Sequence, residues 1–304
     1  MKAVITGATG MIGSTLINIL LKKNIEVIAI IRPNSKKIKN IPKSDKIKIV
    51  ECDLSNLNSL STKLPSCNYF FHFGWISPAG INRNNPELQL KNVQYVLDAV
   101  KLAKAIGCES FIGAGSQAEY GLKNEILSKD TSINPVNSYG IAKYTAGKLS
   151  RILANDLNIK HVWARVLSVY GPKDNNYTLI MSCIDSILNN KSFDTTKGEQ
   201  MWDYIYSEDC AKAFYNLAVN GKNGEVYTIG SGKVRPLKKY ILTIKNNINP
   251  DFNLGIGNLD YSPNQVMYLC ADISNLQKDT GFVPEISFED GIKKTIKWYK
   301  KEML

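Results

Sequence analysis

A glycine-rich turn between an apolar strand and an amphipathic helix constrains this chain more than any other feature. Residues 3–6 form an apolar, β-branched run, and residues 11–23 carry apolar side chains at helical spacing. Between them the sequence places glycines at positions 7, 10 and 13. Gly7 allows a tight turn, Gly10 lets a phosphate approach the backbone, and Gly13 permits close packing of helix on strand. The pattern predicts a dinucleotide site, although glycines also mark ordinary turns.

The start of that helix is expected to hold the pyrophosphate. The amides of Met11 and Ile12 lie in its first turn, where free N–H groups and the helix dipole favour an anion. Thr9, in the turn itself, belongs to the same predicted site.

Alternation of strands and helices predicts the fold class. The strands are nearly continuous apolar runs, as in a parallel sheet covered on both faces. We therefore predict an α/β fold with a Rossmann-like, doubly wound parallel sheet. The predicted strands cover residues 3–6, 27–31, 47–50, 69–73, 110–113 and 162–166, and the predicted helices cover 11–23, 88–106 and 138–155.

The rhythm changes after Gly171-Pro172, where segments 173–200 and 230–268 are richer in Asn, Lys, Gly and Pro. A helix from about Ser207 and a strand at 226–229 separate them, and a helix over 288–301 closes the chain. The predicted division is a dinucleotide-binding domain at 1–170, which also receives parts of 205–230. Residues 171–304 form a smaller C-terminal α+β substrate lobe built from discontinuous segments.

Composition excludes several classes of protein. With 44% hydrophobic and 21% charged residues the chain is expected to be globular rather than disordered. The six cysteines form no C-x-x-C pair and only two histidines occur, so we expect neither a metal site nor a disulfide framework. No basic, apolar leader and no run long enough to span a bilayer is visible, which predicts a cytoplasmic protein with no membrane partner.

The net charge of +11 does not by itself indicate nucleic acid. The lysines are spread along the whole chain, and the densest early cluster, at 36–39, lacks interleaved aromatic residues. Solvated lysine faces, or attraction of an anionic nucleotide substrate, explain the charge better.

The end of the second strand discriminates between coenzymes. A carboxylate there accepts hydrogen bonds from the ribose 2′-hydroxyl of NAD. This chain has Ile31-Arg32 instead, and Arg32 can pair with a 2′-phosphate. NADP(H) is therefore preferred, with NAD(H) possible. Asp53 and Leu54 follow the third strand, where Asp53 either contacts the adenine or caps a helix.

Three residues suit proton transfer at a carbonyl. Tyr139 and Lys143 are four residues apart on a predicted helix and therefore share a face. An ammonium beside a phenol lowers the pKa of that phenol, so we expect Tyr139 to have a lowered pKa. Ser116 follows the fifth strand, at the sheet edge where ligands of such folds bind.

These segments together resemble the extended short-chain dehydrogenase/reductases, the family of nucleotide-sugar epimerases, dehydratases and reductases. The matching motifs run along nearly the whole chain, at Thr6–Gly13, 71–74, Asn92-Val93, Ser116, Tyr139 with Lys143, 165–172, 203–209, 227–232, 271–274 and 281–284.

The resemblance implies functional roles for these residues. It implies a catalytic triad of Ser116, Tyr139 and Lys143, and further coenzyme contacts from Phe73, Gly74 and Val166. It also implies a homodimer formed through the helices predicted at 88–106 and 138–155.

Departures from the family pattern narrow the reaction. Gln117-Ala118 replaces the Asp-Glu pair of dehydratases, which disfavours dehydration. The strand end at Arg32 favours an exchangeable NADPH, and the Ser116 segment resembles nucleotide-sugar 4-ketoreductases such as CDP-abequose synthase. We predict reduction of a keto group, at C4, on a nucleotide-linked deoxysugar. The alternatives are a 4-epimerase with tightly bound NAD and a non-enzymatic redox-sensing module, which the presence of both Tyr139 and Lys143 disfavours.

The substrate-binding residues are the least constrained by the sequence. Trp202 and Ser262 stand where family members often have arginines for the nucleotide diphosphate, and Lys173 is a candidate replacement. Each candidate also fits a second role, as a solvated charge or a buried ring. The predicted set is Arg83, Gln117, Ser168, Trp202 and Arg235.

Overall fold

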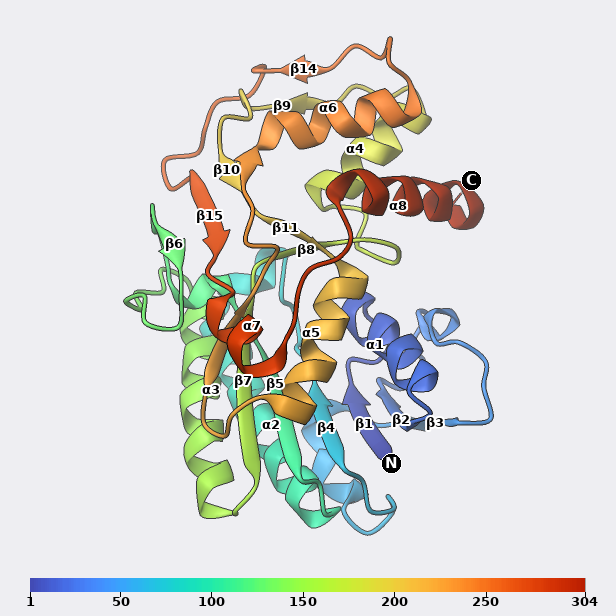
Figure 1. Cartoon of the computed structure of the whole chain (residues 1–304), viewed down its shortest axis with the longest axis vertical. Helices are drawn as coiled ribbons and strands as arrows, with labels where there is room; N and C mark the ends of the chain where they lie inside the picture. The colour runs from blue at the N-terminus through green and yellow to red at the C-terminus, as the bar shows by residue number, and fades with distance from the viewer. Residues whose placement is uncertain (304) are drawn as a thin grey trace.

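Seven parallel strands form the central sheet of the larger, lower unit in Figure 1. The computed structural model describes residues 1–303. The strand order is β12-β7-β5-β4-β1-β2-β3, so the order reverses between β1 and β4, which is where ligands of doubly wound sheets bind. The strands are β1 Lys2–Thr6, β2 Glu26–Ile31, β3 Ile47–Glu51, β4 Tyr69–His72, β5 Ser110–Ser116, β7 Lys160–Val166 and β12 Val226–Ile229.

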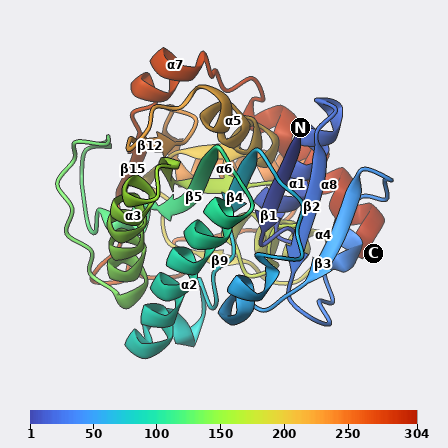
Figure 2. The same cartoon turned by 90° about the horizontal axis from the view of Figure 1, so that it is seen from below.

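Helices cover both faces of this sheet. Seen from below in Figure 2, α2 and α3 lie on one side of the strands, and α5 and α7 lie on the other. The segments outside the sheet are α1 Met11–Lys22, α2 Pro86–Ala105, α3 Ser138–Asp156, α5 Ser207–Asn220 and α7 Ser274–Thr280, with the 3-10 helices η1 Ile38–Asn40, η2 Leu54–Leu60, η3 Ile81–Asn84 and η4 Gln117–Glu119.

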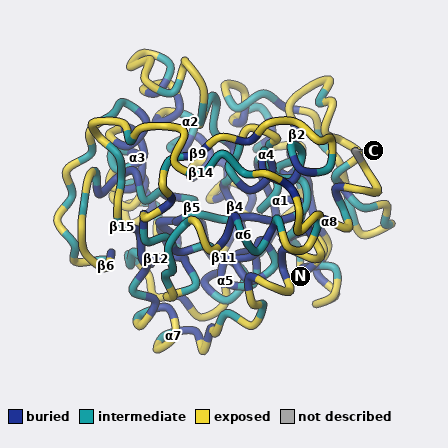
Figure 3. Tube along the Cα trace, turned by 90° about the horizontal axis from the view of Figure 1, so that it is seen from above, coloured by how far each residue is buried: buried dark blue, intermediate teal, exposed yellow. Residues whose placement is uncertain are grey.

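Both faces of the strands are apolar because both are buried. Successive side chains of a strand point to opposite faces, and Val4 packs in the core shared with α2 and α3 while Ile5 packs in the core shared with α1 and α5. Phe70 and Phe71 divide in the same way. In Figure 3 the buried residues accordingly gather in the middle of the molecule, and the exposed ones follow the outer loops.

The smaller lobe lies above the carboxyl ends of the strands (Figure 1). An aromatic-rich core holds its helices together and includes Tyr170, Tyr206, Tyr240 and Phe288. Its elements are the sheet β13-β10-β15-β6 (Arg235–Pro236, Met201–Trp202, Tyr268–Ala271, Ile126–Leu127), the pairs β11-β8 (Tyr204–Tyr206, Ser168–Tyr170) and β14-β9 (Gly255–Ile256, Asp194–Thr195), and the helices α4 Leu179–Leu188, α6 Leu237–Ile248 and α8 Phe288–Met303.

The predicted doubly wound sheet is confirmed, and the structure adds detail to it. The sequence predicts no helix in 173–200 or 230–268, whereas α4 and α6 lie there. Strand β5 continues past the predicted Gly113 to Ser116, because Gly113 to Ser116 remain paired with β7. The extra residues place Ser116 at the very end of the strand.

Within residues 1–303, no helix is both long enough and apolar enough to cross a bilayer. No three His, Cys, Asp or Glu side chains in this part of the chain are grouped as metal ligands would be. All six cysteines are buried and unpaired.

Candidate active site

The glycine turn is shaped by close backbone contacts rather than by side chains. Gly7 has a φ of 67°, which favours glycine, and a Cβ there would lie 2.8 Å from the carbonyl carbon of Phe73. A Cβ on Gly13 would lie 2.5 Å from the Gly7 oxygen. The turn therefore touches the end of β4 on one side and the start of α1 on the other.

The first turn of α1 is left open for an anion. Gly10 is the N-cap, and no side chain caps the helix, so the amides of Met11 and Ile12 receive no side-chain acceptor. The turn is held from outside by Asn40, whose amide donates to the Thr9 carbonyl at 2.9 Å. Open N–H groups behind a glycine cradle fit a dinucleotide pyrophosphate.

Residues after β4 pack against this turn. The Gly74 N–H donates to Thr6 Oγ1 at 3.2 Å, and that hydroxyl also bonds His72 Nδ1 at 2.9 Å. A Cβ on Gly74 would lie 2.8 Å from Leu54 Cδ2. Burial lowers the pKa of His72 to about 3, so its ring is neutral in this network. The predicted coenzyme residues of three strand ends are thus brought together.

Asp53, which follows β3, and Arg32, which follows β2, differ in their surroundings. Asp53 caps η2, accepting from the Ser55 N–H at 3.0 Å and the Ser55 hydroxyl at 2.8 Å. Of the two roles considered for Asp53, capping is the one present in this geometry. Hydrogen bonds from Ser55, and more weakly the charge of Arg32, lower the pKa of Asp53. Arg32 itself is exposed at the end of β2.

Ser116 ends β5 and begins η4 in a capping box. Its hydroxyl accepts from the Ala118 N–H at 3.2 Å, while its own N–H donates to Glu119 at 2.9 Å. Val166 is its register partner on β7. The hydroxyl is thereby fixed at the carboxyl end of the sheet.

Tyr139 and Lys143 lie on the first turns of α3, which Asn137 caps by accepting from the Gly140 N–H. Both side chains are buried. The Lys143 ammonium donates to the Ala114 carbonyl at 2.7 Å and lies 3.8 Å from the Trp75 ring centroid. The Ser116 side chain lies close enough to the Tyr139 phenol to lower its pKa. The structure therefore brings Ser116, Tyr139 and Lys143 into one cluster.

This geometry agrees with a comparison to known protein families. The model of the NAD dependent epimerase/dehydratase family matches residues 3–230. The chain belongs to this family.

Relatives of the chain include reductases, epimerases and dehydratases. The dTDP-4-dehydro-6-deoxyglucose reductase of Escherichia coli is 26% identical over 97% of this chain and 96% of its own length. CDP-abequose synthase of Salmonella typhimurium is 26% identical over 97% of both chains. The structure of a UDP-N-acetylglucosamine 4-epimerase from Methanobrevibacter ruminantium has a TM-score of 0.91, 25% identity and 99% coverage of both chains.

The pKa of Tyr139 differs from the expectation for this member of the epimerase/dehydratase family. Burial raises it, and the nearby Ser116 side chain and the charge of Arg83 only oppose that effect. The expected lowering by Lys143 is wrong here, because desolvation of the buried ring outweighs the lowering by Ser116 and Arg83, and Lys143 is not among the causes of the shift. The phenol is consequently protonated at neutral pH.

Lys143 carries the opposite shift. Burial lowers its pKa to about 7, and the charge of Glu119 opposes the change. Between about pH 7 and pH 10 the unfolded chain therefore holds a proton that the folded chain has released, so rising pH favours folding. We expect the free energy of unfolding of the wild type to increase over this range relative to that of Lys143→Met. Urea denaturation at several pH values measures this, and parallel curves would contradict it.

Three of the predicted substrate residues lie next to one another in the smaller lobe. The Trp202 indole N–H donates to the Ser168 hydroxyl at 2.8 Å, and Trp202 is the strand partner of Arg235. Arg235 forms an ion pair with Glu289 at 2.6 Å, and its guanidinium carbon lies 4.1 Å from the Tyr240 ring centroid. Arg235 is therefore held by an ion pair and an aromatic ring within the smaller lobe, and Ser168 and Trp202 are hydrogen-bonded to each other.

The remaining candidates lie at different places. Arg83 of η3 lies over the Tyr139 ring at 4.4 Å from its centroid, so it joins the cluster of Ser116, Tyr139 and Lys143. Gln117 directly follows Ser116 in η4 and is half-buried. Lys173 donates to the carbonyl of Asn40 at 2.7 Å, and the Asn40 side chain in turn bonds Thr9 of the glycine turn.

Three residues of the site escaped the sequence analysis. Glu119 could have been found, because Ser-x-x-Glu is the pattern of a capping box. Trp75 faces both Lys143 and Tyr139, and its only sequence signal is its place after Gly74. Asn40 reaches the turn across 31 residues, for which the sequence holds no local signal.

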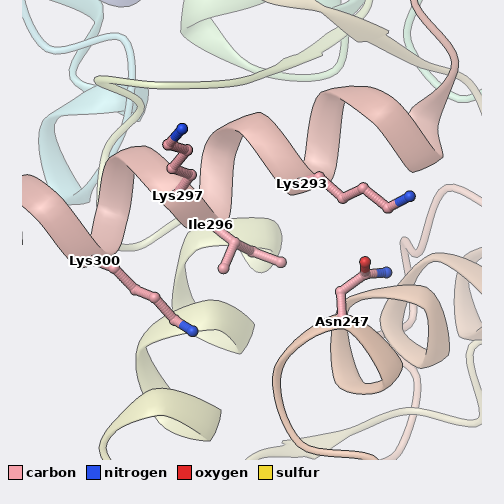
Figure 4. A pocket seen from close by; sticks show the side chains of 5 residues that line it. All are labelled: Asn247, Lys293, Ile296, Lys297 and Lys300. Carbon is pink, nitrogen blue, oxygen red and sulfur yellow. The ribbon is translucent and has the colours of Figure 1, made fainter.

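A lysine-lined groove lies elsewhere in the smaller lobe. Lys293, Lys297 and Lys300 of α8, with Ile296 and Asn247, line a cavity of about 310 Å³ (Figure 4). The three ammonium groups make no ion pair with a carboxylate of residues 1–303. None of the predicted site residues lines this groove. It is a solvated basic surface of the protein.

Proposed function

We propose that this protein reduces a keto group, at C4, on a nucleotide-linked deoxysugar with NADP(H). The observation that carries the proposal is a complete Ser116, Tyr139 and Lys143 cluster beside a strand end that offers Arg32 and no carboxylate. Two relatives, a dTDP-4-dehydro-6-deoxyglucose reductase and CDP-abequose synthase, support it.

We infer that residues 1–170, with parts of 205–230, bind the coenzyme. We expect the coenzyme to contact the glycine turn, the start of α1, the ends of the strands and the first turns of α3. The expected contact residues are Gly7, Thr9, Gly10, Met11, Ile12, Gly13, Arg32, Asp53, Leu54, Phe73, Gly74, Tyr139, Lys143 and Val166. Residues 171–304 supply most of the substrate lobe. Arg83, Gln117, Ser168, Trp202 and Arg235 face the substrate in this proposal, with Arg83 and Gln117 coming from the larger unit.

In the proposed mechanism a reduced nicotinamide supplies the hydride. Tyr139 donates its phenolic proton to the substrate oxygen, a role suited to a phenol that burial keeps protonated at neutral pH. Ser116 donates a hydrogen bond to the same oxygen as negative charge develops. Lys143, when charged, stabilises the phenolate that remains, because opposite charges attract strongly at a buried site.

Gln117 and Ala118 support a reductase over a dehydratase. Removal of water needs a general acid and a general base beside the sugar, and neither side chain ionises. Glu119 is the nearest carboxylate in η4, and it is held in a buried ion pair with Arg165.

A 4-epimerase with tightly bound NAD is the second candidate. It is favoured by the epimerase structure with a TM-score of 0.91, and by relatives named as 4-epimerases at similar identity. An epimerase returns the hydride to the same sugar and therefore consumes no coenzyme.

One experiment separates the two candidates. The purified protein is incubated with NADPH and a panel of CDP-, dTDP-, GDP- and UDP-linked 4-keto sugars, and absorbance of NADPH is followed. Stoichiometric oxidation with one member supports the reductase. Protein that retains NAD through purification and interconverts sugars without added coenzyme supports the epimerase, and overturns the reductase.

The coenzyme preference gives a direct prediction. Arg32→Ala should lower kcat/KM for NADPH about tenfold and leave that for NADH within about twofold, since a hydrogen bond to a charged group is worth about 1.5–3 kcal/mol. Initial rates with each coenzyme measure this. Lys36→Ala, a nearby exposed lysine, is the control. Equal losses for both coenzymes would mean that Arg32 does not recognise a 2′-phosphate.

We also propose a homodimer through α2 and α3. These helices lie side by side and expose Leu90, Ile141, Leu149 and Ile152, each more than 40% accessible. Apolar side chains gathered on one surface are usual at a protein interface.

A further inference from the structure

A buried carboxylate lies directly behind Ser116. Glu119 is fully buried and accepts hydrogen bonds from the Ser116 N–H at 2.9 Å, the Trp163 indole N–H at 3.0 Å and Arg165 Nε at 2.7 Å. The side chains of Glu119 and Arg165 are only 1% and 4% exposed. Ser116 lies on β5, and Trp163 and Arg165 lie on β7, so the carboxylate links the ends of these two strands.

The indole that meets Glu119 is itself fixed in a slot made of glycines. A Cβ on Gly115 of β5 would lie 2.5 Å from Trp163 Nε1, and a Cβ on Gly147 of α3 would lie 2.7 Å from the ring. Gly113 also faces the ring. Because α3 carries Tyr139, the slot fixes the distance between the strand with Ser116 and the helix with Tyr139.

Stability alone does not account for this arrangement. Removing two charges from water costs free energy that the ion pair only partly offsets, and apolar residues of the same volume often serve equally well. Glu119 is also the partner that fixes the Ser116 backbone, which an apolar residue cannot be. Arg165 in turn lies over the Tyr120 ring, 4.7 Å from its centroid, which holds the guanidinium behind the carboxylate.

We propose that Glu119, held by Arg165 and Trp163, is a positioning residue that aims the Ser116 hydroxyl at Tyr139. The proposal rests on the role of Ser116 in the function proposed above. Glu119 makes no hydrogen bond to Tyr139 or Lys143, and its charge reaches Lys143 only at longer range, where it raises the pKa of that ammonium. Its positioning role is exerted through the Ser116 N–H and the turn of η4.

The test is a double-mutant cycle. Glu119→Gln keeps the shape and an acceptor but weakens the bonds to Ser116, Trp163 and Arg165, and it should lower kcat about tenfold with KM and the coenzyme Kd within about twofold. In a Ser116→Ala background the same substitution should have no further effect on kcat, since residues that act through one another are not additive. Equal losses in both backgrounds would overturn the proposal.

Two further variants separate positioning from folding. Glu119→Gln leaves Arg165 buried without its partner, so Glu119→Gln with Arg165→Met should regain thermal stability while kcat remains low. Recovery of kcat along with stability would overturn the proposal. Glu285→Gln breaks an exposed ion pair with Lys212, of 2.6 Å, and is the control expected to leave kcat unchanged.

A crystal structure of Glu119→Gln tests the inference without any substrate. The Ser116 hydroxyl should be displaced relative to Tyr139. An unmoved hydroxyl overturns the positioning role whatever reaction the enzyme catalyses, whereas a displaced hydroxyl in a protein inactive on every keto sugar counts against the proposed reaction alone.

Discussion

Tyr139→Phe is expected to lower kcat for the keto sugar by about 100- to 10,000-fold, the range that general acid catalysis contributes. The substitution removes one oxygen from a buried ring and leaves its contacts with Trp75 and Arg83 in place. The fold and the coenzyme crevice should therefore be unchanged. Following NADPH oxidation under saturating substrate measures the effect.

Coenzyme affinity is the control for this variant. The Kd for NADPH, from the change in its fluorescence on binding, should stay within about threefold of the wild type because only one hydroxyl of the site is lost. Tyr144→Phe, on the same helix, should retain full activity. A Tyr139→Phe enzyme with wild-type kcat would show that another group donates the proton.

The parts of the site that are local in sequence could be predicted from it. Gly7 has a backbone conformation that favours glycine, and neighbouring backbone atoms lie too close to Gly7 and to Gly13 for a Cβ atom to fit. Only glycine meets these requirements. The strand ends at Gly74 and Ser116 follow from the parallel sheet, because all carboxyl ends of parallel strands meet at one edge. These features depend on residue type and spacing alone.

The parts that depend on tertiary packing could not be predicted. Trp75 matters because of what the fold packs against it, and its position has no periodic signal. The Ser-x-x-Glu pattern marks Glu119 as a capping residue, but its bonds to Trp163 and Arg165 depend on packing. The pKa of Tyr139 is a second case. Spacing on α3 places Lys143 nearby, but burial of the ring decides the sign of the shift, and burial is a property of the whole fold.

The helices α4 and α6 were missed for a different reason. Their segments contain many Asn residues, which favour caps and turns, and many Lys residues, which indicate a solvated surface. Their buried faces are nevertheless apolar, with Ile180, Ile184 and Ile187 on α4 packing against Ile241 and Ile244 on α6. Packing of one helix on the other overrides the weak local preference.

Gly10→Val should weaken binding of the coenzyme about 10- to 100-fold with little loss of stability. Gly10 has an extended backbone, with φ −74° and ψ 168°, that any residue adopts, and a Cβ there meets only the Gly7 oxygen, at 3.3 Å. The added side chain instead fills the space that a pyrophosphate needs over α1, and overpacking of this kind costs about 1–3 kcal/mol. Isothermal titration with NADPH measures the affinity, and thermal denaturation measures the stability.

Gly13→Val is the matched variant, because it lies in the same motif but is limited by the fold. Its Cβ would lie 2.5 Å from the Gly7 oxygen and 3.0 Å from the Ala8 Cα, so α1 must move and the melting temperature should fall. Gly10→Val should differ from it by losing affinity while remaining as stable as the wild type. If Gly10→Val binds NADPH as tightly as the wild type does, the pyrophosphate does not lie on this turn, and the coenzyme site must be placed elsewhere on the sheet edge.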